Sequence, residues 1–307
     1  MSMQPCPAPE CQKPSDNLDP VQAVIVSKQR DIGSLLIRRV LPSADVRSVG
    51  PFVFFDHMGP TLYEPGTGLT VRPHPHIGLA TLTYLYDGVI RHRDSLGYRQ
   101  DIKPGAVNWM TAGSGIVHSE RSPEEDIDKP QPLMGLQVWV ALPKAQEQVA
   151  PNFVHLSASS LPEREESGVY IKVIAGECFG MSSKLETVSP LFYVDIRLDA
   201  GSQVQIDIDY TERAVYVVKG VITLANKTYS EGQMLVLAPA VDVTVSSEKG
   251  AIIVAVGGEP MDGERHLWWN FVASDKALIE QAKQAWSAGK FGHVPGDAEH
   301  IPLPHDG

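Results

Sequence analysis

Cysteine is scarce in this chain, with three thiols among 307 residues. So few cysteines, and an odd number of them, exclude a disulfide framework and are typical of proteins from a reducing compartment. Two of the three, Cys6 and Cys11, fall in a proline-rich leader, residues 1–20, whose composition offers too little apolar surface to fold. A lone C-x4-C pair lacks the second ligand pair of a structural zinc site, so we expect two unpaired thiols in a disordered segment.

Basic residues are outnumbered by acidic ones. Lys and Arg total 26 against 37 Asp and Glu, which gives a formal net charge of -11 and disfavours binding to nucleic-acid phosphates or to an anionic membrane. No run approaches the roughly 18 apolar residues of a membrane span, and the first residues contain no apolar signal-peptide core. We therefore expect a cytoplasmic protein with no nucleic acid and no membrane as direct partner.

Glycine and proline are frequent, with 26 and 24 residues. From Val21 onward, turn residues recur about every 8–12 positions and separate short apolar or alternating runs, which is typical of the strands of a sandwich or barrel. The clearest runs cover residues 34–39, 52–55, 79–86, 135–141, 170–175, 192–198, 214–218 and 251–256. The predicted fold class is therefore all-β.

The length favours two domains. A polar, turn-rich stretch over residues 143–166 places the boundary near residue 150, between domains 21–150 and 151–307. The one convincing helical period covers residues 275–287, with Ser274 as the expected N-cap and Gly289 just past the end. Prolines at 295, 302 and 304 predict that the segment around them runs as an extended arm.

Half of the ten histidines fall between residues 57 and 118. His74 and His76 form an H-P-H triplet, and Glu120 follows His118 by two positions. On a strand, residues i and i+2 point to the same face, so each pair can direct both side chains at one point. Three imidazoles and one carboxylate suit Fe(II), Mn, Ni, Cu, Zn or Co, and four protein ligands leave positions open on an octahedral ion, which favours catalysis over a structural role.

Both pairs lie in longer motifs that resemble those of a known family. Residues 74–88 and 105–120, the second ending in G-x-G-x-x-H, resemble the two metal motifs of the cupin superfamily. The combination of FFDHMGP, VRPHPHIGLATLTYLYDG, PGAVNWMTAGSGIVHSE and FGHVPGDAEHIPLP is similar, more specifically, to the pirin family over about residues 21–304. The resemblance implies two tandem jelly-roll-like cupin barrels, with a mononuclear iron in the N-terminal barrel held by His74, His76, His118 and Glu120.

The sequence departs from the general cupin pattern at one ligand. Cupins usually carry a Glu four or five residues after the second histidine, where this chain has Ala80 and Thr81. In pirins the carboxylate comes instead from the position of Glu120. When the glycines of the two halves are aligned, the four ligand positions in the second half are occupied by Ile206, Ile208, Val245 and Ser247. We therefore expect a second barrel with an apolar interior and no metal site.

The pirin resemblance implies quercetin 2,3-dioxygenase activity, with a flavonol and O2 as substrates and carbon monoxide released. A flavonol binds a divalent metal through its 3-oxygen, and Glu120 is the candidate both for ligand and for the base that takes the hydroxyl proton. Because a fold does not determine a function, two alternatives stay open. One is a non-enzymatic, redox-responsive regulator that acts through protein partners, and the other is a zinc-dependent or metal-free isomerase.

Several other residues receive structural assignments. We expect His92, Arg93 and Asp94 to form a hairpin turn with solvated charges rather than to line a pocket. Asp56 and His57 are expected in structural hydrogen bonds. Four bulky side chains are assigned to packing, Trp109 and Met110 to the core and Trp268 and Trp269 to anchoring the C-terminal helix between the barrels.

Overall fold

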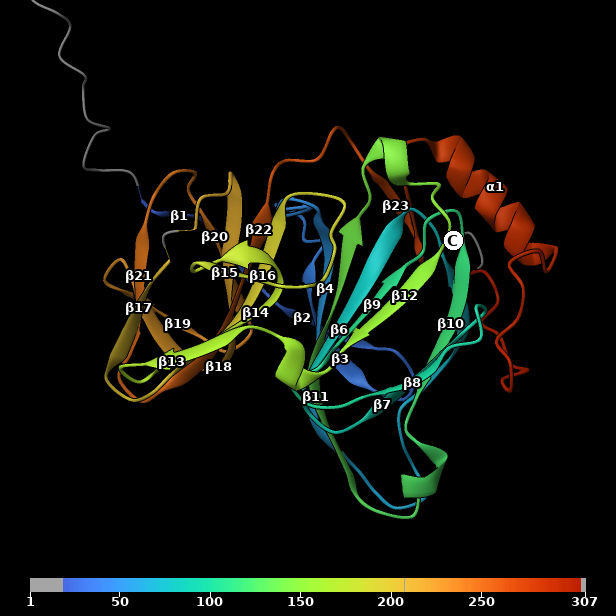
Figure 1. Ribbon diagram of the computed structural model, residues 1–307, viewed down its shortest axis with the longest axis horizontal. Coiled ribbons are helices and arrows are strands. Elements are labelled where there is room, and N and C mark those ends of the chain that lie inside the picture. The colour runs from blue at the N-terminus through green and yellow to red at the C-terminus, as the bar shows by residue number, and fades with distance from the viewer. Residues whose placement is uncertain (1–18, 207, 305–307) are drawn as a thin grey trace, which may run out of the picture.

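The computed structural model describes residues 19–206 and 208–304, which form an all-β protein with one α-helix in these ranges. Two barrels lie side by side (Figure 1), as the tandem cupin prediction requires. Each of the eight predicted runs falls on a strand, because alternating or wholly apolar runs can bury one or both faces of a sheet.

The N-terminal barrel, drawn in blue to green, consists of two antiparallel sheets. Its seven-stranded sheet has the order β12 (Asn152–Leu156), β9 (Val107–Thr111), β6 (Leu79–Asp87), β11 (Gln131–Ala141), β4 (Phe52–Tyr63), β3 (Leu36–Leu41) and β2 (Lys28–Asp31). Its four-stranded sheet has the order β5 (Thr70–His76), β10 (Ile116–Arg121), β7 (Ile90–Asp94) and β8 (Arg99–Ile102). Trp109 and Met110, on β9, are buried as expected.

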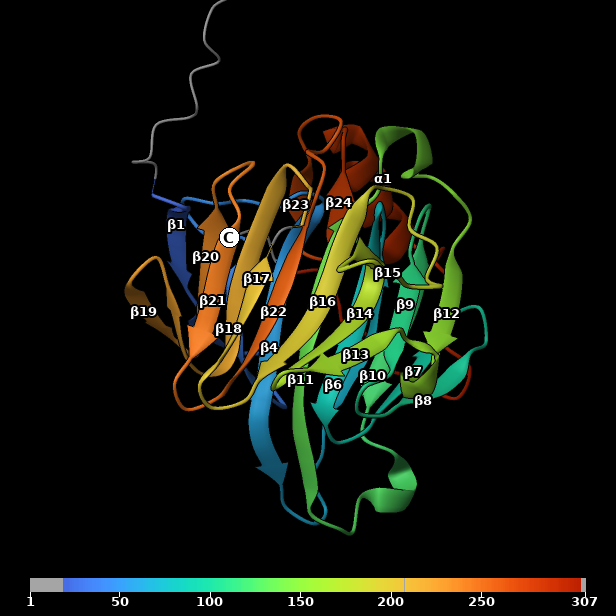
Figure 2. The ribbon, with the colours of Figure 1, turned by 60° about the vertical axis from the view of Figure 1, so that its left-hand side comes forward.

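The second barrel is built around an eleven-stranded sheet, seen best in Figure 2. Its main path runs β1 (Val21–Val26), β20 (Gln233–Leu237), β18 (Glu212–Leu224), β22 (Ala251–Gly258), β16 (Leu191–Leu198), β14 (Val169–Cys178) and β13 (Glu163–Glu166). The branches are β15 (Met181–Ser182), β17 (Ser202–Ile206), β19 (Lys227–Ser230) and β21 (Val243–Ser247). Short 3-10 turns occupy Glu124–Asp126, Lys144–Gln146 and Ala158–Ser160.

The interior of the second barrel is apolar at the positions aligned with the three candidate histidines, while Ser247 stands at the position of Glu120. Val245 pairs with Val204 across β21 and β17, as His118 pairs with His74 in the first barrel. The equivalent of His74 is therefore Val204, two residues before the position that the glycine alignment gave. A shift of two keeps the same face of the strand, and Val204, Ile206 and Val245 are all buried apolar side chains.

The strands do not divide between the sheets at residue 150. Strand β1 comes from the first part of the chain but pairs with β20 of the second barrel. Strand β12 follows residue 150 but pairs with β9 of the first barrel. Each sheet thus takes an outer strand from the other side of the expected boundary, and a division of the chain into two folding units stays a prediction.

The seven-stranded sheet is covered on both faces. On its outer face, Leu82 and Val138 pack in one apolar core with Val254 of the second barrel. The alternate residues of the same strands include Thr83 and Gln137, which point into the first barrel. Because both faces of this sheet are covered, nearly all residues of β6 are buried.

A buried carboxylate joins the two barrels. Asp195, on β16, is fully buried and accepts hydrogen bonds from the hydroxyl groups of Tyr84 and Tyr86 on β6, at 3.0 and 2.9 Å. Arg197 Nε also donates to this carboxylate, at 3.1 Å. The tyrosines and the arginine supply the hydrogen bonds that a buried charge needs, so the interface is fixed by polar contacts as well as by its apolar core.

Asp56 and His57, both on β4, make the structural hydrogen bonds expected of them. Asp56 accepts from Arg39 Nε and Nη2 at 2.9 and 2.8 Å. His57 accepts from Arg38 Nη2 at 3.2 Å, and its Nδ1 donates to the hydroxyl of Tyr216 in the second barrel at 2.9 Å. Burial, together with the charge of Arg38, lowers the pKa of His57 to about 3, so this ring is neutral.

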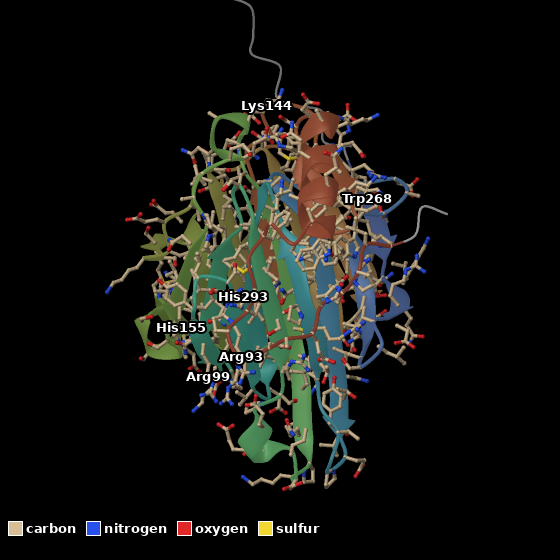
Figure 3. All side chains as sticks on the ribbon, turned by 90° about the vertical axis from the view of Figure 1, so that its right-hand side faces the viewer. Arg93, Arg99, Lys144, His155, Trp268 and His293 are labelled. Carbon is tan, nitrogen blue, oxygen red and sulfur yellow. The ribbon has the colours of Figure 1, made fainter. Side chains whose placement is uncertain are left out.

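The C-terminal segment crosses the N-terminal barrel on the side away from the second barrel (Figures 1 and 3). It contains the hairpin β23 (His266–Trp268) and β24 (Phe271–Ala273), then helix α1 (Lys276–Ser287). The expected N-cap was wrong by one residue: Asp275 accepts from the amide of Ala277, whereas the hydroxyl of Ser274 donates to Glu147.

The expected position of the tryptophans was also wrong. Trp268 and Trp269 pack with Phe271 in the apolar cluster under α1, but this cluster lies on the first barrel and not between the barrels. The helix contributes Ile279 and Ala282 to the same cluster as its buried side chains. A helix of this period needs only one covered face, and the outer surface of a single barrel provides it.

No helix within the two described ranges is long and apolar enough to cross a membrane. The leader with Cys6 and Cys11 lies outside the described residues except for its last two positions. The third cysteine, Cys178, is buried as a free thiol, and burial raises its pKa to about 12, so the thiol stays protonated.

Candidate metal centre

The predicted histidines lie on two neighbouring strands of the four-stranded sheet. His74 and His76 are on β5 and His118 is on β10, where His118 pairs with His74 and the neighbouring Ile116 pairs with His76. Strand β5 is at the edge of its sheet, which accommodates the prolines on either side of His74, because an edge strand needs fewer of its amide hydrogens. The alternation of the strand then turns both histidines to the same face.

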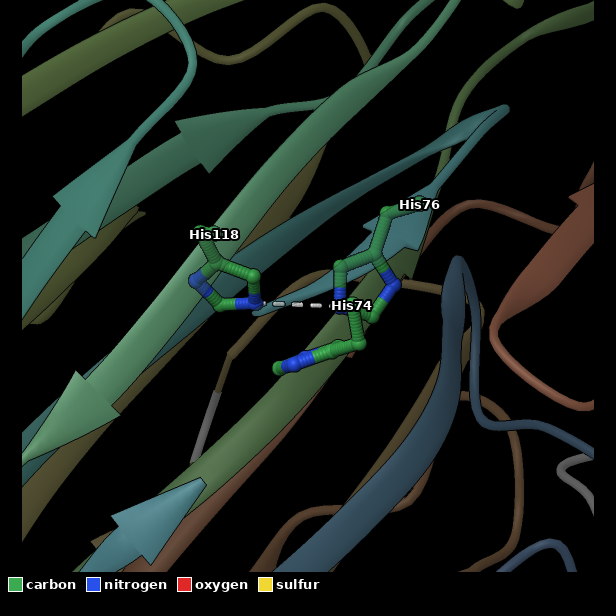
Figure 4. A group of neighbouring side chains, drawn as sticks. All are labelled: His74, His76 and His118. Carbon is green, nitrogen blue, oxygen red and sulfur yellow. Dashed lines mark hydrogen bonds between the residues drawn. The ribbon is translucent and has the colours of Figure 1, made fainter. Parts of the chain in front are cut away.

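The three imidazoles converge inside the N-terminal barrel (Figure 4). One ring nitrogen from each of His74, His76 and His118 lies within 4.8 Å of the others. The closest pair is Nε2 of His76 and Nε2 of His118, 3.1 Å apart. All three side chains are buried, so the sequence prediction that these histidines meet at one point is confirmed.

The hydrogen bonds on the far side of two rings set their tautomers. His74 Nδ1 donates to the carbonyl oxygen of Arg72 at 2.9 Å, and His76 Nδ1 donates to that of Asn270 at 3.0 Å. A carbonyl only accepts, so the proton of each neutral ring is on Nδ1 and the lone pair is on Nε2. Both lone pairs therefore belong to the nitrogen that is available to a metal.

The third ring is backed by a second histidine. His118 Nδ1 lies 3.4 Å from Nδ1 of His92, whose Nε2 donates to Oδ2 of Asp94 at 2.9 Å. This places a carboxylate and an imidazole behind His118, where His74 and His76 have a main-chain carbonyl.

Burial keeps these rings uncharged. It is the main cause that lowers the pKa of His74 to about 4, and it holds the pKa values of His76 and His118 well below the ordinary range of histidine. Three neutral imidazoles that share one buried point offer lone pairs with no protons to displace, which suits a transition metal. The donor set thus fits the group that the sequence predicts.

Glu120 lies beside this group but outside it. Its carboxylate is not within 4.8 Å of all three ring nitrogens, and it is hydrogen-bonded to Gln137 and Thr83 on the opposite sheet. Burial raises the pKa of Glu120 to about 7 against the effect of these hydrogen bonds. Thr83 Oγ1 donates to Gln137 Oε1 at 2.8 Å, so the two partners of Glu120 are also bonded to each other.

A cavity of about 400 Å³ is lined by His74 and His76 and also by Glu120. One wall is a stack of planar groups: the ring of Phe54 lies 3.9 Å from that of Trp139 at 9°, and the guanidinium of Arg39 lies 4.3 Å from the Phe54 centroid. Much of the remaining lining is aliphatic, from Ile32, Ile37, Met58, Leu69, Val71 and Ile90. The cavity therefore combines a wall of planar groups and an aliphatic lining with polar side chains, His74 and His76 among them.

A polar row crosses the seven-stranded sheet on this side. Arg39, Asp56, Gln137 and Thr83 are register partners on β3, β4, β11 and β6, so their side chains point to the same face of the sheet. The first three line the cavity. The sheet thus presents a charged pair at one end of the row and the partners of Glu120 at the other.

The C-terminal segment closes the rest of the cavity. Trp269, Asn270 and Ile301 line it, and the amide of Ile301 donates to the carbonyl of Pro73 on β5 at 2.8 Å. Arg121, at the end of β10, holds the same segment through Asp297 at 2.8 Å. The predicted arm, residues 295–304, therefore lies along the edge of the sheet that carries His74 and His76.

Comparisons with known proteins agree with this architecture. The Pirin family model matches residues 34–140 and the Pirin C-terminal cupin domain matches residues 193–292. A Pirin-like protein of Caulobacter vibrioides is 44% identical over 92% of this chain and 99% of its own length. This chain belongs to the pirin family.

Two solved structures are similar to this pirin. Quercetin 2,3-dioxygenase from Acinetobacter baumannii superposes with a TM-score of 0.86 at 33% identity, covering 92% of this chain and 94% of that one. A bacterial pirin from Escherichia coli, solved in complex with nickel(II), has a TM-score of 0.62 at 18% identity and covers 78% of this chain and 99% of its own. The second likeness concerns the fold alone.

The expectation for the H-R-D segment of this pirin was wrong. His92 and Asp94 are buried in β7, behind His118, and only Arg93 points outward, where it donates to Glu124 at 2.6 Å. The sequence did contain a signal for their burial on one face, because His92 and Asp94 are two residues apart on a strand, with the same spacing as His74 and His76. The contact of Asn270 with His76 carried no such signal, because it joins a main-chain carbonyl to a ring 194 positions away.

Proposed function

We propose that this pirin binds Fe(II) through His74, His76, His118 and Glu120 and is a flavonol 2,3-dioxygenase of the quercetin type. The observation that carries the proposal is the convergence of three buried imidazoles, two of which, His74 and His76, line a cavity with a wall of planar side chains. The similarity to the quercetin 2,3-dioxygenase of Acinetobacter baumannii over nearly the whole chain supports the same activity.

The ligand set includes a carboxylate that is close but bonded elsewhere. Glu120 would complete the site by exchanging its hydrogen bonds with Gln137 and Thr83 for the metal. A bound divalent ion supplies Lewis acidity toward a substrate oxygen and a place where the flavonol and O2 can meet. Affinity alone favours copper and zinc over iron at such a site, so elemental analysis of protein from its native cell tests the choice of iron.

The cavity is suited to a planar aromatic molecule. Its volume of about 400 Å³ lies within the range of about 300–1,000 Å³ found for small-molecule sites. The stacked Trp139, Phe54 and Arg39 form a wall of planar groups against whose edges a flat ring system can pack. Arg39 uses Nε and Nη2 for Asp56, so its Nη1 is the donor that faces a hydroxyl or keto oxygen of the bound ligand.

Glu120 is the proposed base. It lines the cavity next to His74 and His76, and its elevated pKa, about 7, is suited to a group that accepts a proton near neutral pH. Gln137 and Thr83 hold its carboxylate from the other sheet. These contacts orient the oxygen that would take the proton of the flavonol 3-hydroxyl.

Turnover is the direct test. In the overall reaction both atoms of O2 enter the ring-opened ester, and the carbon that bore the 3-hydroxyl leaves as carbon monoxide. Iron-loaded protein mixed with quercetin in air should remove the flavonol absorbance, consume one O2 and release one carbon monoxide for each quercetin lost. The His76→Ala variant and free Fe(II) at equal concentration are the controls, and rates equal to theirs would refute the enzyme.

A redox-responsive regulator that acts through protein partners is the second candidate. The contact between His76 and Asn270 favours it, because it connects a metal ligand to a segment on the outside of the barrel. The two candidates differ in the quercetin assay: a regulator shows no turnover above free metal but binds a partner in only one oxidation state. In both cases we expect a cytoplasmic protein, in line with the sparse cysteines.

A further inference from the structure

The three histidines of the proposed metal site meet at one point but have different partners behind them. His74 and His76 donate from Nδ1 to neutral main-chain carbonyls. His118 faces His92, which in turn donates to Asp94. One of the three rings is therefore connected to a negative charge through a second imidazole, and the other two are not.

Asp94 is held rigidly. Its Oδ1 accepts from the amides of Leu96 and Tyr98, at 2.9 and 3.1 Å, and its Oδ2 accepts from His92 Nε2 at 2.9 Å. The residue is fully buried. With Oδ1 occupied by the turn that follows β7, only Oδ2 is presented to His92, so the carboxylate can act only as an acceptor toward that ring.

The ring of His92 is fixed as well. It stacks on Phe153 of β12 with centroids 4.3 Å apart and 14° between the planes, and the residue is buried. Its Nε2 must carry a proton to donate to Asp94. Its Nδ1 then faces the Nδ1 of His118 at 3.4 Å, and one proton lies between the two nitrogens.

The position of that proton decides whether His118 can bind a metal through Nε2. If His118 Nδ1 donates to His92, the lone pair of His118 is on Nε2, which points to the Nε2 of His76. If His92 donates instead, a neutral His118 carries its proton on Nε2 and cannot ligate there. A metal at this nitrogen therefore requires the first arrangement, in which His118 is the donor.

We propose that Asp94 and His92 are positioning residues of the metal centre, which fix His118 in the Nδ1-protonated tautomer and strengthen its Nε2 as a donor. The inference rests on the metal site proposed above. A carboxylate behind a ligand imidazole increases the basicity of that ligand and orients its ring. A more basic nitrogen stabilises Fe(III) over Fe(II), so the pair lowers the reduction potential of bound iron.

Asp94→Asn is the sharpest test, because it changes the chemistry and nearly preserves the shape. The amides of Leu96 and Tyr98 need an acceptor, so they bind the amide oxygen of the new side chain and turn its NH2 group toward His92 Nε2. His92 must then move its proton to Nδ1, where it opposes the Nδ1 proton of His118. We expect Fe(II) affinity to fall about 10–100-fold and the Fe(III)/Fe(II) midpoint potential to rise.

A second variant and a control separate this role from packing. His92→Phe keeps a ring on Phe153 but has no nitrogen, and it should move affinity and potential in the same direction. Asp101→Asn removes a carboxylate from β8 of the same sheet, where it accepts from Arg91 at 2.7 and 2.9 Å, and should leave both quantities unchanged. Thermal unfolding of the metal-free variants shows which of them are folded for comparison.

The measurements separate the role of His92 and Asp94 from the existence of the metal site. Wild-type protein that binds no iron refutes the metal site. If wild-type protein binds iron and both folded variants keep its affinity and midpoint potential, only the role of His92 and Asp94 is refuted. Equal changes in the Asp101→Asn control also refute it, because any lost carboxylate in that sheet would then suffice.

Discussion

Nδ1 of His76 lies 3.0 Å from the main-chain oxygen of Asn270, so the C-terminal segment orients a histidine of the proposed metal site. Asn270 is held in place by its neighbour Phe271, which is fully buried and forms a β-bridge with Ile77. The hairpin therefore serves two purposes, since it covers the barrel and determines which nitrogen of His76 faces the cavity.

Phe271→Ala should weaken metal binding without changing any ligand. Loss of this buried ring costs about 3–5 kcal/mol of unfolding free energy, and the freed hairpin no longer holds Asn270 against His76, so we expect about tenfold lower Fe(II) affinity. Phe192→Ala, also fully buried but in the second barrel, is the matched control. Titration of metal-free protein should show weaker binding in the first variant alone.

The proposed ligand set predicts how many metal ions each chain binds. We expect about one transition-metal ion per chain, lost in His76→Ala or His118→Ala and bound more weakly in Glu120→Ala, because a carboxylate bonded to Gln137 and Thr83 gains less on binding than a free one would. Elemental analysis after dialysis measures the metal content. Full occupancy in a variant that lacks both His74 and His118 would contradict the assignment.

Arg39→Lys should change substrate binding more than the chemical step. Lysine loses the fork that binds Asp56 through two nitrogens and the stack on Phe54. A loss of about 1.4 kcal/mol, typical of a desolvated cation–π contact and a hydrogen bond, raises KM for quercetin about tenfold, while kcat stays within about threefold. Arg30→Lys, on the exposed strand β2, should leave both constants unchanged, and a fall in kcat alone for Arg39→Lys would contradict a binding role.

His57 should make the metal-free protein less stable in acid. Its pKa is about 3 in the folded protein and about 6.5 in an unfolded chain, so the unfolded state takes up the proton first as the pH falls. Its contribution to stability is complete above pH 6.5 and is lost progressively down to pH 3. At pH 5 the loss is about 2 kcal/mol, from 1.36 kcal/mol per unit over about 1.5 units.

His57→Gln should remove this dependence. Glutamine can accept from Arg38 and donate to Tyr216, as the histidine does, but it does not titrate. Urea unfolding of both proteins at pH 5 and pH 7.5, with chelator present, compares the two differences. Equal pH dependence in variant and wild type would place the acid sensitivity at other groups.

Local patterns were sufficient for the strands and for the three histidines that meet in the first barrel. Alternation and turn spacing located all eight predicted runs, and the i, i+2 rule placed His74 with His76 on one strand face. The same rule applied to His92 and Asp94 would have identified the pair behind His118. The expectation of solvated charges was wrong there, because Phe153 on β12 of the other sheet stacks on the ring of His92.

Contacts that depend on the tertiary arrangement could not be predicted from the sequence. Nothing near Asn270 marks its carbonyl as a partner of His76, and the pairing of β1 with β20 follows no local signal. Trp268 and Trp269 were expected to anchor helix α1 between the barrels, but the period of a helix does not say which surface covers its apolar face. The capping residue was likewise decided by a distant group, since Glu147 takes the hydroxyl of Ser274.

The pairing of β1 with the second barrel affects how the protein can fold during its synthesis. Val26 pairs with Gln233, which lies 207 positions further along the chain. At about 5–20 residues per second, the ribosome needs about 10–40 s to reach β20. During that time β1 has no partner, and the first barrel can form only from the strands after it. The second sheet therefore takes its edge strand from residues that were synthesised long before its other strands.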